Sequence, residues 1–191
     1  MDYLNLNPGY GASVPAAGKL LIAEPLLNDP NFARSVVLLC EHGAEGSLGF
    51  VLNQATEYTL QDVLPELVAG AQVPIFQGGP VQADTLHMIH SYPGNDGLEI
   101  VKGVFWGGSY DSLRKIALLH NTSSLRLFMG YSGWGPGQLQ HEMEEGTWLV
   151  ADATAHLLFN TQPQDIWKRA IEGLGSKYAF LSNMPTDPLF N

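Results

Sequence analysis

"SVVLLCEHGAEGSLGFVLN", residues 35–53, contains two apolar runs separated by a short segment rich in glycine. Residues 35–42 and 48–53 are runs of strand length, and the segment between them is typical of a turn. Parallel neighbours in a sheet need a crossover of about a dozen residues or more, so this short connection predicts an antiparallel pair. We therefore expect a sheet that is at least partly antiparallel.

Other strands and helices interleave on both sides of this pair without strict βαβ order. Apolar runs predict strands over residues 19–23, 73–77, 86–92, 98–108, 124–131 and 147–151. Helical spacing predicts helices over residues 60–69, 110–120, 138–145, 154–160 and 165–173, with capping residues Thr59 with Asp62, Ser109, and Thr161 with Gln164. This order favours an α+β domain with a mixed sheet. We expect residues 1–17 to form an N-terminal arm and residues 18–191 a single domain.

The charge of the chain argues against direct binding to DNA. Nine basic and nineteen acidic residues among 191 give a net charge of −10, and the basic residues are scattered. The N-terminus lacks a basic start followed by an apolar segment, and no run approaches the roughly 18 apolar residues of a membrane span. Cys40, the single cysteine, cannot form an internal disulfide and is predicted to be buried. We expect a cytoplasmic protein with no membrane partner.

A second stretch, "GYSGWGPGQL" at residues 130–139, has the composition of a reactive loop but not the required spacing. A nucleophile elbow needs a glycine two residues after its serine, whereas Trp134 follows Ser132 at that distance. A phosphate-binding P-loop needs Lys and then Ser or Thr after its last glycine, whereas Gln138 and Leu139 follow Gly137. These two reaction types are therefore not indicated.

The same stretch leaves two interpretations open. Gly133, Gly135 and Gly137 match the dinucleotide fingerprint only in part, and no βαβ frame supports it. Backbone amides at the start of the following helix could hold an anion or a carboxylate. Alternatively, the glycines provide positive φ angles and close backbone contacts while Trp134 fills the core. "FQGGPV", residues 76–81, poses a similar choice, because Gly78 and Gly79 suit either a sharp turn or a ligand at the end of a strand.

The histidines and acidic residues do not predict a metal site. His87 and His90 are three residues apart in a predicted strand, which places them on opposite faces of the sheet. His141 and Glu145 have the spacing of an ordinary pair on a helix surface. Glu142, Glu144 and Glu145 are interpreted as a solvated acidic face. We expect no metal and no cofactor.

Three separated motifs together resemble one known family. They are "GKLLIAEPLLNDPNFARSVVLLCEHGAEGSLGFVLN", "FQGGPV" followed by "IHS", and "GYSGWGPGQL" with "WLVADAT" and "LLF". In this combination and order the chain resembles the YqgE/AlgH family of small bacterial proteins. The resemblance implies an α+β fold with a mixed, bent, partly barrel-like sheet surrounded by helices. One branch of the family has been described as transcriptional regulators, and no agreed set of catalytic residues can be carried over.

Two functional hypotheses follow. The first is a bacterial cytosolic binding or regulatory module, not an enzyme, that controls transcription indirectly through an unknown protein or small-molecule partner. Its candidate binding residues, placed where the glycine-rich motifs converge, are His42, Asn53, Gly78, Gly79, His90, Gly133, Gly137 and Gln138. The alternative is a hydrolase-type enzyme in which His42 or His90 is the base and Asn53 or Gln138 a polar stabiliser.

Overall fold

The computed structural model describes residues 14–67, 72–94, 96–118 and 122–184. Most of the predicted N-terminal arm, including Leu4, Leu6 and Tyr10, lies outside the described residues. The strands are β1 (Lys19–Ala23), β2 (Val36–Gly43), β3 (Gly46–Val51), β4 (Ala55–Thr59), β5 (Pro74–Gln77), β6 (Val81–His90), β7 (Leu98–Val101), β8 (Val104–Trp106), β9 (Leu125–Trp134) and β10 (Trp148–Asp152). The helices are α1 (Leu60–Val63), α2 (Tyr110–Leu118), α3 (Gln138–Glu144), α4 (Ala155–Asn160) and α5 (Pro163–Gly173), with 3-10 turns η1 (Thr122–Ser124) and η2 (Ala179–Asn183).

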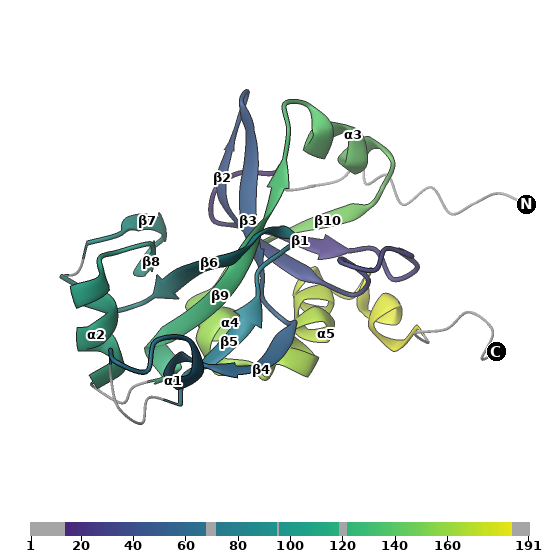
Figure 1. The fold of residues 1–191 in the computed structure, drawn as a ribbon. Coiled ribbons are helices and arrows are strands. Elements are labelled where there is room, and N and C mark those ends of the chain that lie inside the picture. Colours follow the sequence, from purple (N-terminus) through teal and green to yellow (C-terminus); the bar gives the residue numbers. More distant parts are fainter. Residues whose placement is uncertain (1–13, 68–71, 95, 119–121, 185–191) are drawn as a thin grey trace, which may run out of the picture.

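Strand β9 is the centre of the sheet. The strand order is β10-β1-β2-β3-β9-β6-β8-β7, and β5 with its neighbour β4 joins beside β9 (Figure 1). One edge of β9 pairs with β6, while the other pairs first with β5 at residues 127–129 and then with β3 at residues 132–134. The β5–β9 pairing is parallel, and the β2–β3 pair is the predicted antiparallel hairpin. The predicted mixed sheet of an α+β domain is confirmed.

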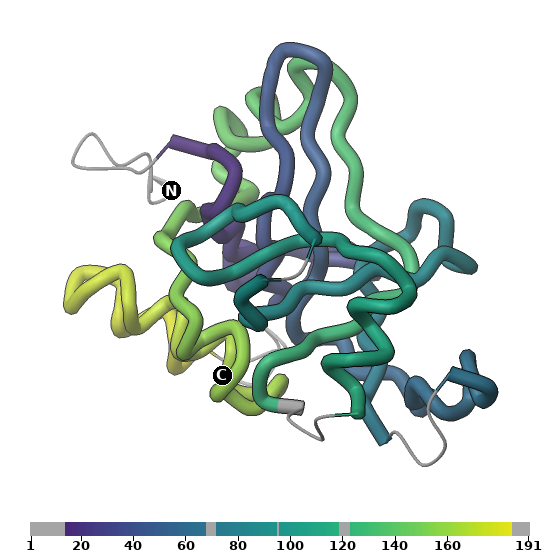
Figure 2. Tube along the Cα trace, turned by 90° about the vertical axis from the view of Figure 1, so that its left-hand side faces the viewer, coloured from purple at the N-terminus to yellow at the C-terminus, as the bar shows by residue number. Residues whose placement is uncertain are grey.

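The sheet bends until its two ends approach each other. A Cβ atom at Gly18, just before β1, would collide with the carbonyl oxygen of Ile100 in β7. Because β1 and β7 lie far apart in the strand order, this contact requires the sheet to curl into a half-barrel. The β2–β3 hairpin and the C-terminal part of β9 rise side by side above the rest of the sheet (Figure 2).

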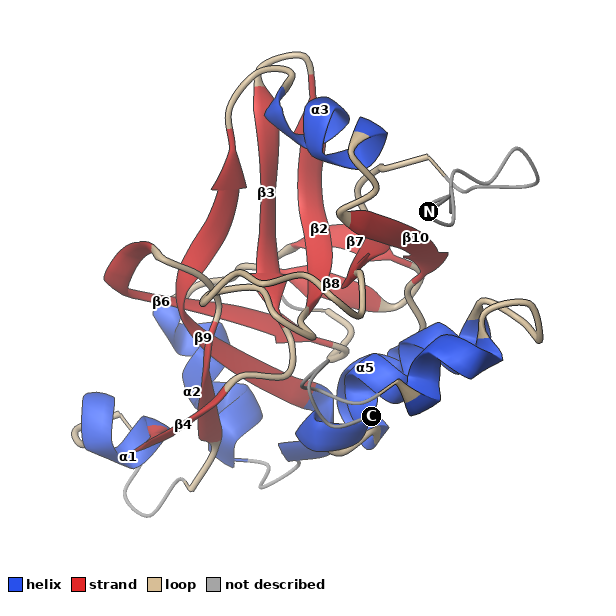
Figure 3. Cartoon of the chain, turned by 90° about the vertical axis from the view of Figure 1, so that its right-hand side faces the viewer, coloured by secondary structure: helices blue, strands red, loops and turns tan. Residues whose placement is uncertain are grey.

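Helices cover the curled sheet at three places. α4 and α5 pack on one side, where Leu158, Ile166 and Trp167 join the main core with Phe50 and Phe128 (both helices are labelled in Figure 1, and α5 also in Figure 3). α1 and α2 lie at the end of the sheet formed by β5, β6 and the start of β9, over a second cluster. α3 lies beside the projecting hairpin, over a third cluster.

A buried arginine joins α4 to the sheet. The Arg126 side chain on β9 is 7% exposed and donates to the backbone carbonyls of Leu52, Leu158 and Thr161, at 3.0 Å for Leu52 and 3.1 Å for Thr161. Its guanidinium also lies 4.8 Å from the centre of the Phe76 ring. Burial lowers the pKa of Arg126 to about 10, so the group is still a cation at neutral pH.

Some predicted elements differ from the observed ones. The single strand predicted over residues 98–108 is a hairpin of β7 and β8 that turns at Gly103, where φ is +74°. β9 extends to Trp134, three residues beyond its predicted end and into the glycine-rich stretch, because β3 offers it a further pairing edge. β4 was not predicted, since its sequence "ATEYT" is polar and largely exposed.

The predicted helix starts also have mixed outcomes. Asp62 accepts hydrogen bonds from the Thr59 amide and hydroxyl at 2.8 and 2.7 Å, which confirms that predicted pair. The helix that they start, α1, ends at Val63, well before the predicted residue 69. The Thr161/Gln164 prediction is wrong, because Thr161 ends α4 and α5 begins at Pro163, whose missing amide hydrogen suits the first helical position.

Candidate functional site

The three glycine-rich motifs meet at β9, as the binding hypothesis requires, and they do so through their backbones. The Gly78 amide donates to the Met129 carbonyl at 2.8 Å, and the Gly78 carbonyl accepts from the Val51 amide at 2.9 Å and the Ser132 hydroxyl at 3.0 Å. A Cβ atom on Gly78 would collide with the carbonyl of Gly130. The backbone contacts therefore account for glycine at residue 78.

Gly79, like Gly78, has no room for a side chain. A Cβ atom on Gly79 would collide with the backbone of Tyr131 and Ser132, and both Gly78 and Gly79 are buried. We define Gly78, Gly79 and residues 130–132 as the glycine junction. It is a close backbone crossing of these two chain segments, to which Val51 of β3 adds the hydrogen bond from its amide to the Gly78 carbonyl.

Three of the candidate residues are exposed where the end of β9 leads into α3, namely Gly133, Gly137 and Gln138. Gly137 precedes α3 with φ at +75°, and nothing lies within 4 Å of the position of a Cβ atom there. The Gln138 side chain accepts from the Gly135 amide at 3.1 Å and donates to Glu142 at 3.0 Å. Of the backbone amides around this helix start, those of Gly135, Gln138 and His141 are bonded within the chain.

Glu142 connects two tryptophans and is not part of a solvated acidic face, which corrects that interpretation. Its Oε2 accepts from the indole nitrogens of Trp134 and Trp148, each at 2.8 Å. The two indole rings lie edge to face at 6.1 Å, and Phe32 contacts both. Glu144 and Glu145 are exposed.

We predict that Glu142→Gln lowers the free energy of unfolding by about 1–2 kcal/mol, because hydrogen bonds to a charged group are stronger than those to a neutral amide. Urea unfolding followed by tryptophan fluorescence measures the change. Glu144→Gln is the matched control, since exposed Glu144 accepts from Gln140 on the same helix, and about 0.5 kcal/mol or less is expected. Equal effects of both substitutions would contradict the assigned role of Glu142.

His42 and Asn53 have separate partners. His42 is exposed near the end of the β2–β3 hairpin, where its Nδ1 lies 2.8 Å from the Ser47 hydroxyl. Asn53 accepts from the Val36 amide at 3.0 Å and donates to the Arg34 carbonyl at 2.9 Å. Both polar groups of Asn53 are therefore used to hold the loop before β2.

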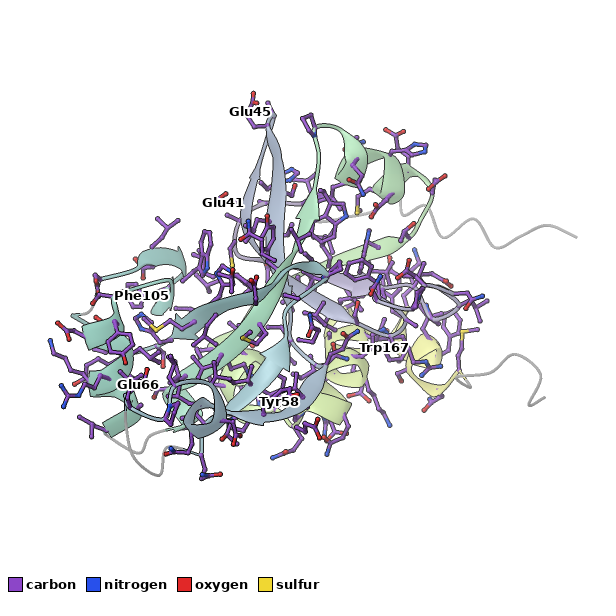
Figure 4. The ribbon with its side chains drawn as sticks, viewed as in Figure 1. Glu41, Glu45, Tyr58, Glu66, Phe105 and Trp167 are labelled. Atoms are coloured by element: carbon purple, nitrogen blue, oxygen red, sulfur yellow. The ribbon has the colours of Figure 1, made fainter. Side chains whose placement is uncertain are left out.

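His90 lies at the other end of β9 from His42. His90 pairs with Leu125, whereas Ser47, the partner of His42, pairs with Trp134. Leu125 and Trp134 are nine steps apart along β9, or roughly 30 Å at about 3.3 Å per residue. Figure 4 labels Glu41, next to His42, on the projecting hairpin, and Phe105, on which His90 stacks, near α2. The structure therefore does not bring the two proposed bases to one site, and the hydrolase alternative is not favoured.

His87 was not among the predicted site residues. Its Nε2 is buried without a hydrogen-bond partner among the described residues, and its ring lies 5.0 Å from Phe50 and 6.0 Å from Tyr131. His90 stacks instead on Phe105, with the ring centres 5.5 Å apart. Its Nε2 is also buried with no hydrogen-bond partner in the described part of the chain. These separate neighbours agree with the prediction that the two histidines lie on opposite faces of β6.

We predict that the stability of the protein falls as the pH drops below about 6.5. Burial lowers the pKa of both His87 and His90 from 6.5, so the unfolded chain binds more protons than the folded one below that pH. His87→Phe keeps an aromatic ring against Phe50 and Tyr131, and we expect it to reduce this dependence. Urea unfolding at pH 7, 6 and 5 measures it, and equal slopes for both proteins would contradict the prediction.

A pocket lies where the chain leaves β8 and starts α2. Its volume is about 410 Å³. The lining residues come from the end of α1, from β6 and β8, and from α2, and they are Leu64, Leu86, His87, Met88, Trp106, Gly107, Gly108, Ser109, Tyr110 and Leu113. This pocket was not predicted, because residues 98–108 were assigned to one strand. The pair Gly107–Gly108 after an apolar run was the available signal.

The N-terminus of α2, at the edge of this pocket, is held by Asp96. Its carboxylate accepts from the Ser109 amide at 2.9 Å and from the hydroxyls of Ser109 and Ser112. These hydrogen bonds, that of Ser112 first, lower the pKa of Asp96, so the carboxylate is ionised at neutral pH. Within the described chain, no group of three or more His, Cys, Asp or Glu side chains is placed to hold a metal ion.

Together these features define a small α+β protein with a sheet curled into a half-barrel and a ligand-sized pocket at one end. Comparison with known proteins identifies the family: the AlgH-like family matches residues 20–179. A UPF0301 protein of Chlorobium limicola is 43% identical over 91% of this chain and 95% of its own length. One of Bacteroides thetaiotaomicron is 40% identical, with coverage of 93% and 92%. The chain belongs to the AlgH-like family.

Two solved structures share the fold. The solution structure of the AlgH protein of Pseudomonas aeruginosa has a TM-score of 0.72 and 31% identity, covering 92% of this chain and 98% of that one. The crystal structure of the protein DIP2367 of Corynebacterium diphtheriae has a TM-score of 0.76 and 25% identity, covering 91% and 95%. In the described part of the chain, no helix has the length and apolar character needed to cross a membrane.

Proposed function

We propose that this protein is a binding module of the bacterial cytoplasm that acts by binding a small molecule, and that any control of transcription is indirect. The observation that carries the proposal is the pocket between β6, β8, α1 and α2. Its volume of about 410 Å³ falls within the roughly 300–1,000 Å³ of ligand sites, and its largely apolar lining with a few polar groups is typical of them.

We place the binding site at this pocket rather than at the glycine junction. The polar groups of Asn53 and Gln138 are bonded within the chain, and a Cβ atom at Gly78 or Gly79 would meet neighbouring backbone. Alanine at Asn53 or Gln138 is therefore expected to leave ligand binding unchanged in any variant that folds.

The test is to incubate the purified protein with a small-molecule extract of bacterial cells and to identify what it retains by mass spectrometry. Leu64→Trp and Leu86→Trp each add a large ring to a half-buried residue of the pocket. Leu118→Trp is the matched control, because Leu118 is exposed on α2 and does not line the pocket. Circular dichroism checks that each variant is folded.

We expect at least one compound that wild type and Leu118→Trp retain and that both pocket variants lose about tenfold or more. Retention that is equal in all four proteins, or no retained compound at all, would overturn the proposal.

We expect that the protein does not bind DNA directly. A net charge of −10, with basic residues scattered along the sequence, makes the neutralisation of several phosphates together unfavourable. We predict no saturable binding of fluorescent duplex DNA at about physiological salt, measured by anisotropy. Tight binding that weakens steeply with added salt would show that the protein contacts DNA after all.

A further inference from the structure

The lining of the α2 pocket, on which the proposed function rests, also limits the chemistry of its ligand. Leucines and a methionine form much of the lining, and none of its described residues is a lysine, arginine, aspartate or glutamate. His87, the one titratable group near neutral pH, has its pKa lowered by burial and is uncharged at pH 7. A ligand that carried a buried charge would find no partner here, and an unpaired buried charge is costly.

A negative charge bonded to the edge of the pocket makes anions the least suitable ligands. The ionised carboxylate of Asp96 is bonded to Ser109, which lines the pocket, and a Cβ atom at Gly108 would lie 2.6 Å from the Asp96 carbonyl oxygen. Asp96 accepts from the Ser109 amide, just before α2, and from the Ser112 hydroxyl, and the Ser112 amide donates to the Ser109 hydroxyl, so a carboxylate already lies at this helix start. A cation would meet a carboxylate whose oxygens already accept three hydrogen bonds.

The shape of the pocket favours a planar ring. Gly107 and Gly108 form part of the wall without side chains, and nothing lies within 4 Å of the position of a Cβ atom on Gly107. Met88, whose thioether makes favourable contacts with aromatic rings, lies beside this wall. The pocket volume of about 410 Å³ falls within the roughly 300–1,000 Å³ of small-molecule sites, which is ample for a fused ring.

The Tyr110 hydroxyl is a hydrogen-bonding group at the edge of the pocket. Tyr110 lines the pocket, is 51% exposed, and its hydroxyl has no hydrogen-bond partner among the described residues. A half-exposed tyrosine beside an apolar pocket can cover a ligand with its ring while its hydroxyl donates to an acceptor on the ligand.

We propose that the α2 pocket binds a neutral aromatic small molecule, with its ring between the Gly107–Gly108 wall and the side chains of Leu64, Leu86 and Leu113, and with a hydrogen-bond acceptor directed to the Tyr110 hydroxyl.

The test uses three probes that share one ring and differ in charge: indole-3-acetamide, indole-3-acetate and tryptamine. Each is titrated into the ¹⁵N-labelled full-length protein, and amide chemical shifts are followed. Indole-3-acetamide is expected to shift the Gly107, Gly108 and Ser109 amides saturably and to bind at least tenfold more tightly than either charged probe. Leu64→Trp is expected to abolish these shifts and Leu118→Trp to keep them. Tyr110→Phe should weaken binding by about threefold, as the loss of one hydrogen bond implies.

Every other result counts against the proposal. Equal or tighter binding of the acetate or the amine, shifts that persist in Leu64→Trp, or no binding by any of the three probes would overturn the assignment to neutral aromatics. If the cell extract still yields a compound that wild type retains and that Leu64→Trp and Leu86→Trp lose, the binding function stands and only the ligand class is wrong. If the extract yields no such compound either, both proposals fail.

Discussion

Gly79→Ala is expected to prevent stable folding, with a loss in the free energy of unfolding of more than about 4 kcal/mol. A Cβ atom at this residue would collide with the carbonyl carbon and oxygen of Tyr131 and with the amide nitrogen of Ser132. These are backbone atoms of β9, which is held on both edges by other strands and cannot move aside. Soluble yield and urea unfolding measure the effect.

Gly137→Ala is the matched control for this prediction. Gly137 has a φ angle of +75°, yet no atom lies within 4 Å of the position of a Cβ atom. The cost there is only the strain of a left-handed backbone, about 1–2 kcal/mol. If Gly79→Ala were no more destabilising than Gly137→Ala, the glycine junction would not be the close backbone crossing described above.

Arg126→Met is expected to lower the free energy of unfolding by about 3–5 kcal/mol. The substitution preserves apolar volume but leaves the carbonyls of Leu52, Leu158 and Thr161 without their donor, and each unsatisfied buried group costs about 1–3 kcal/mol. The expected total lies toward the lower end of that sum because water can reach the partly buried Thr161 contact. Urea unfolding at pH 7 measures the change.

Two further variants separate the hydrogen bonds from the charge of Arg126. Arg126→Lys keeps a cation but cannot supply the planar set of donors, and we expect it to recover less than half of the loss. Arg114, an exposed residue of α2, is the control for removing a positive charge. We expect Arg114→Met to change the free energy of unfolding by no more than about 0.5 kcal/mol. Full recovery by lysine would mean that charge, rather than donor geometry, holds α4 to the sheet.

Local patterns were sufficient for many of the elements. The hairpin in residues 35–53 follows from two apolar runs and a connection too short for a crossover, and the structure places β2 and β3 there. The Thr59/Asp62 pair and the opposite faces of His87 and His90 also depend only on neighbours a few residues away. Predictions failed where a distant strand mattered, as at the end of β9, whose extension depends on pairing with β3.

The candidate site was less predictable than the fold. The binding hypothesis required the glycine-rich motifs to converge, but the sequence could not distinguish a backbone crossing from a ligand site, because glycine suits both. It also grouped His42 and His90, which lie at opposite ends of β9. The pocket was missed because its lining comes from α1, β6, β8 and α2, and no single segment carries its pattern.

The sequence by itself therefore determined the α+β class, the family, the hairpin from which the sheet is built, and the absence of the spacing needed for a nucleophile elbow or a P-loop. The family follows from a resemblance carried by three separated motifs in one order, whereas the other conclusions depend on periodicity and spacing within short segments, which the local backbone geometry controls. Only the tertiary structure decided that Gly78 and Gly79 serve a backbone crossing, that Glu142 joins two tryptophans, and that the pocket lies beside α2. Each of these depends on contacts between segments far apart in the chain, which the curl of the sheet around β9 brings together.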